Sequence, residues 1–354
     1  MMADGQQKAE KTYSVAVVAT MSAGKSTLLN AMIGKRLLPS KNEACTATVF
    51  RIKDEDGRNE FGAAQRKGGA LEPEIRPITI QELADWNMQA PDEIIITGDV
   101  RTIRNTEKGL KIEFVDTPGP NNSACADHGK ITESIIAGAD FASLVVVLNA
   151  SVAGVEDELR VLNRLRRCLD ESGKKLRMIF VVNKIDVLDP EAGEAPVRTI
   201  KDIRSYLKEL GFKNPIVVPT MGELALTIRE AISGMIKYEP GKGDPSVPLK
   251  FKKKAYMVQG SPRQQMALRV GVERIVALRE FYRAGFRASR EVADALVRVD
   301  HTRKLRRLEG VVLIGGKFFK FRDIRSVEKC TGVPILEWFL QRDLEAFENF
   351  RRRR

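Results

Sequence analysis

The sequence predicts an α/β fold in which a doubly wound sheet of parallel strands is flanked by helices. Two observations support this fold class. Short apolar runs alternate with helical patterns through the first two thirds of the chain, as in parallel strands joined by crossover helices. The apolar runs are also continuous, which is expected of strands that are covered on both faces. The chain therefore belongs among proteins with a central buried sheet.

The expected elements follow from these patterns in chain order. Strands are predicted at 13–20, 110–115, 143–148, 178–182 and 215–218, with helices at 26–34, 156–169 and 198–210. Residues 53–75 are polar and rich in glycine, so we interpret them as a surface excursion. The densest cluster of proline and glycine, at 238–248, predicts a break after the α/β part.

The last third of the chain has a different composition. The whole chain has a formal net charge of +12, and residues 236–354 hold 28 Lys and Arg against 14 Asp and Glu. Residues 272–299 combine apolar positions at helical spacing with a row of arginines, namely Arg279, Arg283, Arg287 and Arg290. One interpretation is a surface for anionic lipid headgroups or nucleic-acid phosphates. The other is a helical hairpin packed on the α/β domain, with its arginines solvated or ion-paired.

Further along, the Gly-Gly pair within 311–321 separates two apolar runs and predicts a β-hairpin.

Composition excludes several classes of protein. Apolar residues make up 43% and charged residues 30% of the chain, which is ordinary for a soluble globular protein. No apolar stretch reaches the ~18 residues that a membrane span needs. The four cysteines are far apart and form no CxxC, which argues against a disulfide framework or a zinc ribbon. With only two histidines, a His-dependent nucleophilic triad is not expected.

A phosphate-binding loop is predicted directly after the first strand. The segment 19–27 (ATMSAGKST) nearly matches G-x-x-x-x-G-K-[ST] and lies between a strand and a helix, although Ala19 replaces the first glycine. Backbone N–H groups of the loop and the helix N-terminus would cradle phosphates. Lys25 would neutralise the β- and γ-phosphate oxygens, and the Ser26 hydroxyl would bind Mg²⁺. The nucleotide-binding residues expected here are Met21, Ser22, Ala23, Gly24, Lys25, Ser26 and Thr27.

Two further segments are expected near the γ-phosphate. Asp116-Thr117-Pro118-Gly119 follows an apolar strand, so the Asp116 carboxylate would hold Mg²⁺ and the Gly119 N–H would meet the γ-phosphate. Between this motif and the phosphate loop, Thr46 is the threonine expected to reach Mg²⁺ only when the γ-phosphate is present, with Thr48 in reserve.

The base is predicted to be guanine. Asn183-Lys184-Ile185-Asp186 follows a strand, and the Asp186 carboxylate can accept from both N1–H and the 2-amino group of guanine. Adenine offers neither donor and would leave the carboxylate unpaired. Asn183 would tie this segment to the phosphate loop, and the amides of Thr220 and Met221 would contact the guanine O6. We therefore expect GTP rather than ATP.

Together these motifs resemble those of the bacterial dynamin-like GTPases. The resemblance rests on SAGKSTLLNA at 22–31, LLP at 37–39, CTA at 45–47 and DTPGPN at 116–121. It covers roughly residues 12–235 and returns at 331–337, which looks like the start of the last helix of such domains. It implies GTP hydrolysis at a P-loop GTPase sheet, with Ser22, Lys25, Thr46 and Gly119 as catalytic residues and Ser26, Thr46 and Asp116 as Mg²⁺ ligands.

The resemblance also implies how the protein is activated. GTPase domains of this group pair across their nucleotides, so a nucleotide-dependent homodimer is expected, and Ser22 would help to bind a monovalent cation, K⁺ or Na⁺. Eukaryotic dynamins have a glutamine where this chain has Met21, which cannot hydrogen-bond the attacking water. An isolated subunit is therefore expected to hydrolyse GTP slowly.

The predicted organisation is a dynamin-type GTPase domain at 12–236, a basic, mainly helical insertion at 237–328, and the last helix of the GTPase domain at 329–350. We expect a cytoplasmic protein that binds GTP and GDP and attaches peripherally to an anionic membrane surface. The alternative is a GTP-dependent switch that binds RNA or the ribosome through its basic third. A third alternative is a structural nucleotide binder that hardly turns over.

Overall fold

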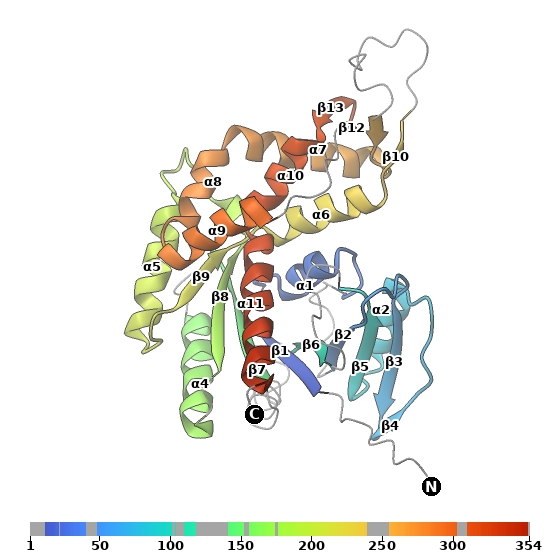
Figure 1. The fold of residues 1–354 in the computed structure, drawn as a ribbon, viewed down its shortest axis with the longest axis vertical. Helices are drawn as coiled ribbons and strands as arrows, with labels where there is room; N and C mark the ends of the chain where they lie inside the picture. The colour runs from blue at the N-terminus through green and yellow to red at the C-terminus, as the bar shows by residue number, and fades with distance from the viewer. Residues whose placement is uncertain are drawn as a thin grey trace.

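A computed structural model describes residues 11–20, 22–39, 48–100, 103, 110–117, 141–151, 156–173, 176–238, 255–302 and 310–352. At its centre lies a nine-stranded sheet with the order β4-β3-β5-β2-β6-β1-β7-β8-β9 (Figure 1). Helices cover both faces of the sheet, which confirms the α/β fold class that the sequence predicts.

The strands of this sheet are β1 (Lys11–Ala19), β2 (Val49–Asp54), β3 (Gly62–Lys67), β4 (Ala70–Leu71), β5 (Glu93–Gly98), β6 (Leu110–Asp116), β7 (Phe141–Asn149), β8 (Arg177–Asn183) and β9 (Ile216–Pro219). The helices are α1 (Lys25–Ile33), α2 (Ile80–Met88), α4 (Glu156–Ser172), α5 (Pro196–Glu209), α6 (Gly222–Ser233), α7 (Pro262–Ala277), α8 (Arg279–Phe286), α9 (Arg290–Thr302), α10 (Phe321–Cys330) and α11 (Val333–Arg352). All five predicted strands and all three predicted helices are present.

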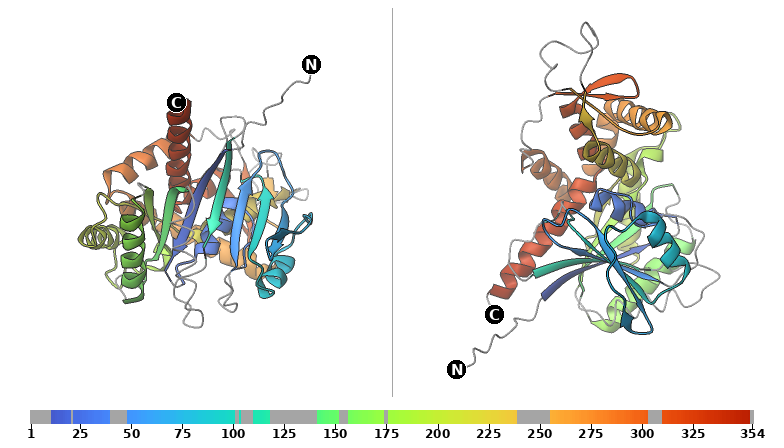
Figure 2. Two further views of the ribbon diagram at one scale, coloured as in Figure 1. Left: turned by 90° about the horizontal axis from the view of Figure 1, so that it is seen from below. Right: turned by 90° about the vertical axis from the view of Figure 1, so that its right-hand side faces the viewer.

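The strands β6, β1, β7, β8 and β9 are parallel and are buried on both faces. In β1, Val15 and Val17 pack in the apolar cluster that contains residues of α1 and α11, whereas Ala16 and Val18 pack in the cluster that contains residues of α4 and α5. Figure 2 shows α11 on one side of the twisted sheet and the green helices α4 and α5 on the other. Continuous apolar runs are needed because successive side chains enter different clusters.

Most of residues 53–75 is exposed, as expected, but the segment is part of the sheet and not an irregular excursion. This segment completes β2 and supplies β3 and β4, which extend the sheet beyond β5. Strand β2 is antiparallel to β6 and parallel to β5, and β3 is antiparallel to β5. The buried residues of β3 include Gly62, Ala63 and Ala64, whose small side chains give a weak apolar signal. A small residue is also needed at the end of the neighbouring strand β5, where a Cβ on Gly98 would lie 2.3 Å from the Phe61 ring.

A second, smaller sheet follows the α/β part, with the order β10-β11-β12-β13. It consists of β10 (Ile236–Lys237), β11 (Ala255–Met257), β12 (Val311–Ile314) and β13 (Lys317–Lys320). Strands β12 and β13 form the predicted hairpin, and its two turn residues, Gly315 and Gly316, have φ of 51° and 80°. Two successive positive φ values are typical of a tight hairpin turn, which favours glycine at both positions.

The basic segment packs directly on the α/β part. Leu268, Val272 and Ile275 of α7 and Tyr282 of α8 are buried in the same apolar cluster as α4 and α5. The structure thus shows the packed helical arrangement, with three helices in place of a hairpin. Within it, Arg287 is ion-paired with Glu280, and Glu291 of α9 pairs with Arg204 of α5, whereas Arg279 and Arg290 are exposed.

The helix expected at 329–350 is α11, which begins at Val333. Within the described ranges, none of the helices is both long enough and apolar enough to span a bilayer.

Candidate functional site

The predicted site residues gather at one edge of the main sheet. Strands β1, β6, β8 and β9 are parallel, so their carboxyl ends meet at this edge. Lys25 follows β1, Asp116 ends β6, Asn183 ends β8 and Thr220 follows β9. In open α/β sheets, ligands bind in the crevice at the carboxyl ends of the strands.

The phosphate loop turns sharply into α1. Ser22 has φ 54° and Gly24 has φ 83°, both in the left-handed region. Gly24 is the N-cap of α1 and makes no side-chain hydrogen bond, so the cap residue itself leaves the N-terminal amides of α1 open. Such amides, aligned with the helix dipole, attract an anion. The loop and helix therefore have the geometry of a phosphate cradle.

Lys25 and Asp116 form an ion pair at this cradle. Their side chains are 14% and 7% exposed, so both charges are largely removed from water. Burial raises the pKa of Asp116, and the charge of Lys25 opposes this shift. Each of these two charges could instead bind part of a ligand. The Lys25 ammonium could bind phosphate oxygens, and the Asp116 carboxylate could bind a cation.

The donors that would hold Mg²⁺ fit that ion. The Ser26 hydroxyl and the Asp116 carboxylate are hard oxygen ligands of the kind that Mg²⁺ prefers. The register of β2 with β6 sets Phe50 opposite Asp116, which brings Thr48 to the same edge. Thr48 is buried, and its Oγ1 has no hydrogen-bond partner among the described residues. Met21, Thr46 and Gly119, which the sequence also assigns to the site, lie outside the described residues.

Asn183 joins the phosphate loop to the base-binding segments. Its Nδ2 donates to the Ala23 carbonyl at 2.9 Å. Its Oδ1 accepts from the Thr220 hydroxyl at 3.0 Å and from the Gly222 N–H at 2.9 Å. The side chain is buried, so these bonds are shielded from water. One amide thus fixes the distance between the phosphate end and the base end of the site.

The loop predicted to bind the base, here the base-binding loop, is formed by Lys184, with φ 63°, and a short 3₁₀ helix at Ile185–Val187. The Ile185 N–H donates to the Thr220 carbonyl at 3.1 Å, which holds this loop against the end of β9. Burial raises the pKa of Asp186, and the nearby positive charge of Arg274 opposes that shift. Asp186 is half-buried, so its carboxylate is accessible to a ligand.

Helix α7 lies beside the base-binding loop, a neighbour that sequence reasoning missed. An open groove of about 540 Å³ lies between Asp186, Leu224 and the α7 residues, which include Arg263, Met266, Val270, Gly271 and Arg274. Arg274 also donates to the Leu188 carbonyl at 3.4 Å. No local sequence signal indicates this contact, because Arg274 is separated from Asp186 by more than eighty residues and several elements.

A second missed contact comes from the segment before α11. The Met221 N–H donates to the Thr331 carbonyl at 2.8 Å. Gly332 has φ 74°, and a Cβ there would lie 1.9 Å from the Pro219 carbonyl oxygen. The backbone of this segment therefore supports the Thr220–Met221 turn. The sequence resemblance at 331–337 predicts a helix start but not this support.

The strand–loop–helix cradle, its lysine–aspartate pair and the Asn-Lys-x-Asp loop on a doubly wound sheet define a P-loop GTPase domain. Residues 15–185 match the sequence profile of the Dynamin family. The chain therefore carries a bacterial dynamin-like GTPase domain, as the sequence motifs indicate.

Individual proteins are similar to part of this chain. The chain is 27% identical over 234 residues to isoniazid-induced protein IniC of Mycobacterium tuberculosis, a match that covers 61% of this chain and 43% of that protein. It is 27% identical over 194 residues to the bacterial dynamin-like protein of Nostoc punctiforme, covering 51% of this chain and 26% of that protein. The matches thus span less than half the length of these relatives.

A solved structure described as an oligomerised bacterial dynamin pair, with a mechanism for long-range sensing and tethering of membranes, overlaps with a TM-score of 0.45 at 18% identity. That overlap covers 62% of this chain and 41% of the other.

Proposed function

We propose that the chain binds GTP with Mg²⁺ and hydrolyses it to GDP and phosphate. The observation that carries this proposal is the hydrogen-bonding of Asn183, which links the phosphate loop to the base-binding turn. It sets Lys25 and Asp186 at two ends of one continuous edge, as a single nucleotide requires.

Each residue would contribute by position and charge. Lys25 leaves its ion pair with Asp116 and neutralises the β- and γ-phosphate oxygens, while Ser26 and Asp116 hold Mg²⁺, which when bound spreads the charge that develops on the phosphates. Thr46 closes the metal shell, and the Gly119 N–H contacts the γ-phosphate. Asp186 accepts from the guanine edge. Phosphoryl transfer to water needs positioning and electrostatic stabilisation more than a side-chain base.

Lys25→Ala tests the phosphate end. Loss of the ammonium should weaken GTP binding at least ~100-fold, measured by calorimetry with Mg²⁺ present. Lys35→Ala is the matched control, because Lys35 is exposed just beyond the end of the same helix. If both variants bind GTP like the parent, the phosphate site has been misassigned.

Asp186→Asn tests the base end. An amide cannot accept from N1–H and the 2-amino group together, so GTP should bind more weakly and xanthosine triphosphate, whose 2-oxo group needs a donor, more tightly. Asp189→Asn is the control, since Asp189 is exposed three residues further on. An unchanged preference between the two nucleotides would remove Asp186 from the base site.

The hydrolysis step is proposed to need a second copy of the chain. Met21 offers no hydrogen bond to an attacking water, so a monomer should turn over at only ~10⁻⁴–10⁻² s⁻¹. Pairing across the nucleotides would order the segments around Ser22 and Thr46. Specific activity should then rise with protein concentration, and GDP with aluminium fluoride should convert the protein to a dimer in light scattering.

Replacing K⁺ by a bulky organic cation should lower the rate if Ser22 holds a monovalent ion. Concentration-independent turnover by a monomeric fluoride complex would contradict the dimer mechanism.

The exposed arginines of the basic segment are proposed to meet an anionic membrane surface. Arg279, Arg287 and Arg290 are exposed, while large apolar residues of the same helices, such as Tyr282, Phe286 and Val292, are buried. The protein would then adsorb to the membrane by charge rather than by insertion. The fraction of protein that floats with liposomes containing anionic lipid should therefore fall steeply as salt is added. Liposomes of neutral lipid, otherwise prepared in the same way, serve as the control. Nuclease-sensitive association with RNA in place of flotation would favour the alternative partner.

A further inference from the structure

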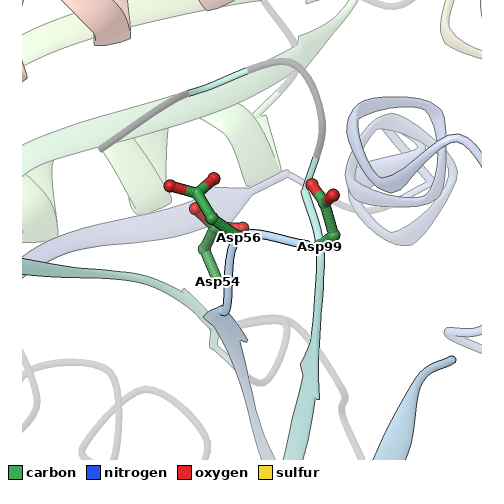
Figure 3. A group of neighbouring side chains, drawn as sticks. All are labelled: Asp54, Asp56 and Asp99. Atoms are coloured by element: carbon green, nitrogen blue, oxygen red, sulfur yellow. The ribbon is translucent and has the colours of Figure 1, made fainter. Parts of the chain in front are cut away.

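Three aspartates gather at the end of the sheet that is remote from the nucleotide site. Asp54 ends β2, Asp56 lies in the turn that follows, and Asp99 follows β5 (Figure 3). Because β2 is parallel to β5 but antiparallel to β6, the carboxyl ends of β2 and β5 lie at the edge opposite Asp116. The cluster is thus separate from the residues that would hold Mg²⁺ beside GTP.

The main chain fixes these three side chains relative to one another. The Glu55 N–H donates to the Gly98 carbonyl at 3.0 Å, which ties the turn after β2 to the end of β5. Asp99 accepts from the Gly57 N–H at 3.2 Å through Oδ2. One carboxylate oxygen from each aspartate lies within 4.8 Å of the others. That spacing is what one cation bound between them needs.

Asp54 supplies the observation that points to a ligand. The residue is only 3% exposed, and its Oδ1 accepts from the Val100 N–H at 2.8 Å. Its Oδ2 is buried and has no hydrogen-bond partner among the described residues. Figure 3 shows this carboxylate close to that of Asp56. A buried carboxylate oxygen without a partner is costly, so it needs either a proton or a cation.

The charges around the cluster increase that need. Burial and the negative charges of Asp56 and Asp99 raise the pKa of Asp54 to about 7. The nearby guanidinium of Arg58 is directed elsewhere, to Glu55 and Glu74. Within the described part of the chain, no ion pair to any of the three aspartates is formed.

We propose that Asp54, Asp56 and Asp99 bind a hard divalent cation of the Ca²⁺ type. All three ligands are carboxylate oxygens, which such cations prefer. Ca²⁺ accepts six to eight oxygens in irregular geometry, so waters and main-chain carbonyls can complete a shell that the exposed side of the turn leaves open. Mg²⁺ is less suited, because it demands a near-ideal octahedron and gives up its waters reluctantly. Bound there, the cation would cross-link the turn after β2 to the end of β5.

The test uses the full chain without nucleotide, treated with EDTA and dialysed, so that the GTP site contributes no bound metal. Titration with CaCl₂ in a calorimeter should show one saturable site. Asp56→Asn and Asp99→Asn should each weaken that site at least ~tenfold, since each removes one of three close charges. The matched control is Asp92→Asn, an exposed aspartate just before the other end of β5. Its affinity should equal that of the parent.

A thermal melt provides the second readout and does not depend on GTP hydrolysis. CaCl₂ should raise the Tm of the parent and of Asp92→Asn, but not that of Asp56→Asn, whose exposed side chain can change without disturbing the fold. Absence of saturable Ca²⁺ binding by the parent would show that the cluster holds a proton, and the proposal would be wrong. Equal Ca²⁺ affinity in all variants would likewise overturn it.

Discussion

Replacing Arg229 by methionine should destabilise the whole protein, because this one side chain joins its own helix to three others. Arg229 of α6 forms a two-point ion pair with Glu337 of α11, at 2.6 and 3.0 Å. Its Nε donates to Glu328 of α10 at 3.1 Å, and it also donates to the Ala31 carbonyl of α1 at 2.6 Å. Because α1 begins at the phosphate loop, these bonds connect the nucleotide site to the end of the chain.

The size of the effect follows from burial. Arg229, Glu328 and Glu337 are 7%, 3% and 2% exposed, so removing the guanidinium leaves two carboxylates away from water with less compensation. Removing one partner of a buried ion pair typically costs about 3–5 kcal/mol. The lost bond to Ala31 adds about 1 kcal/mol. We expect the free energy of unfolding to fall by about 4–6 kcal/mol, a large part of the stability of an ordinary domain.

Guanidinium unfolding followed by circular dichroism measures this change. The double variant Arg229→Met, Glu337→Leu removes both charges of the closest pair and should recover part of the lost stability. A loss below about 1 kcal/mol in the single variant would refute the reasoning. So would a double variant that is no more stable than Arg229→Met.

Two further predictions concern a glycine and a titration. Gly24→Ala should weaken GTP binding at least ~tenfold, because a Cβ there would lie 2.7 Å from the Asn183 amide. The control is Gly34→Ala, which has a similar φ and nothing within 4 Å of the added Cβ, and it should bind GTP like the parent. Equal GTP affinities of the two variants in calorimetry would contradict the prediction. Burial raises the pKa of Asp343 to about 6 although Arg177 opposes it. The folded state therefore binds more protons than the unfolded chain between about pH 4 and 6, and this contribution to stability is lost as pH rises through that window. Between about pH 4 and 6, the free energy of unfolding of the parent should fall by up to about 3 kcal/mol relative to that of Asp343→Asn. If the two proteins show the same pH dependence of unfolding, the effect is excluded.

Much of the fold could be predicted because the relevant signals are local. The five central strands are continuous apolar runs. The pair Gly315–Gly316 predicts a hairpin turn because both residues tolerate positive φ. The phosphate loop and the Asn183–Asp186 motif likewise combine a strand, a loop and a helix within a few residues. Such signals need no knowledge of distant parts of the chain.

The remaining features depend on tertiary contacts. Strand β3 is buried with small residues such as Ala63 and Ala64, so its sequence does not look apolar enough for a strand. The position of α7 beside Asp186 depends on how a helix far along the chain packs, and hydropathy reports only which of its faces is buried. The pairing of Asp54 with Asp99 arises because β2 and β5 are neighbours in the sheet, although β3 and α2 separate them in sequence.

The shared apolar cluster of α4, α5, α7 and α10 makes the basic segment an integral part of one folding unit. Cutting the chain after Tyr238 would expose apolar residues of this cluster on both pieces. The arginine-bearing helices are therefore not expected to fold as a separate domain. Those helices also contact the base-binding loop directly, since Arg274 and Tyr282 donate to its main-chain carbonyls. Binding of a surface that displaces α7 or α8 would therefore also displace the base-binding loop.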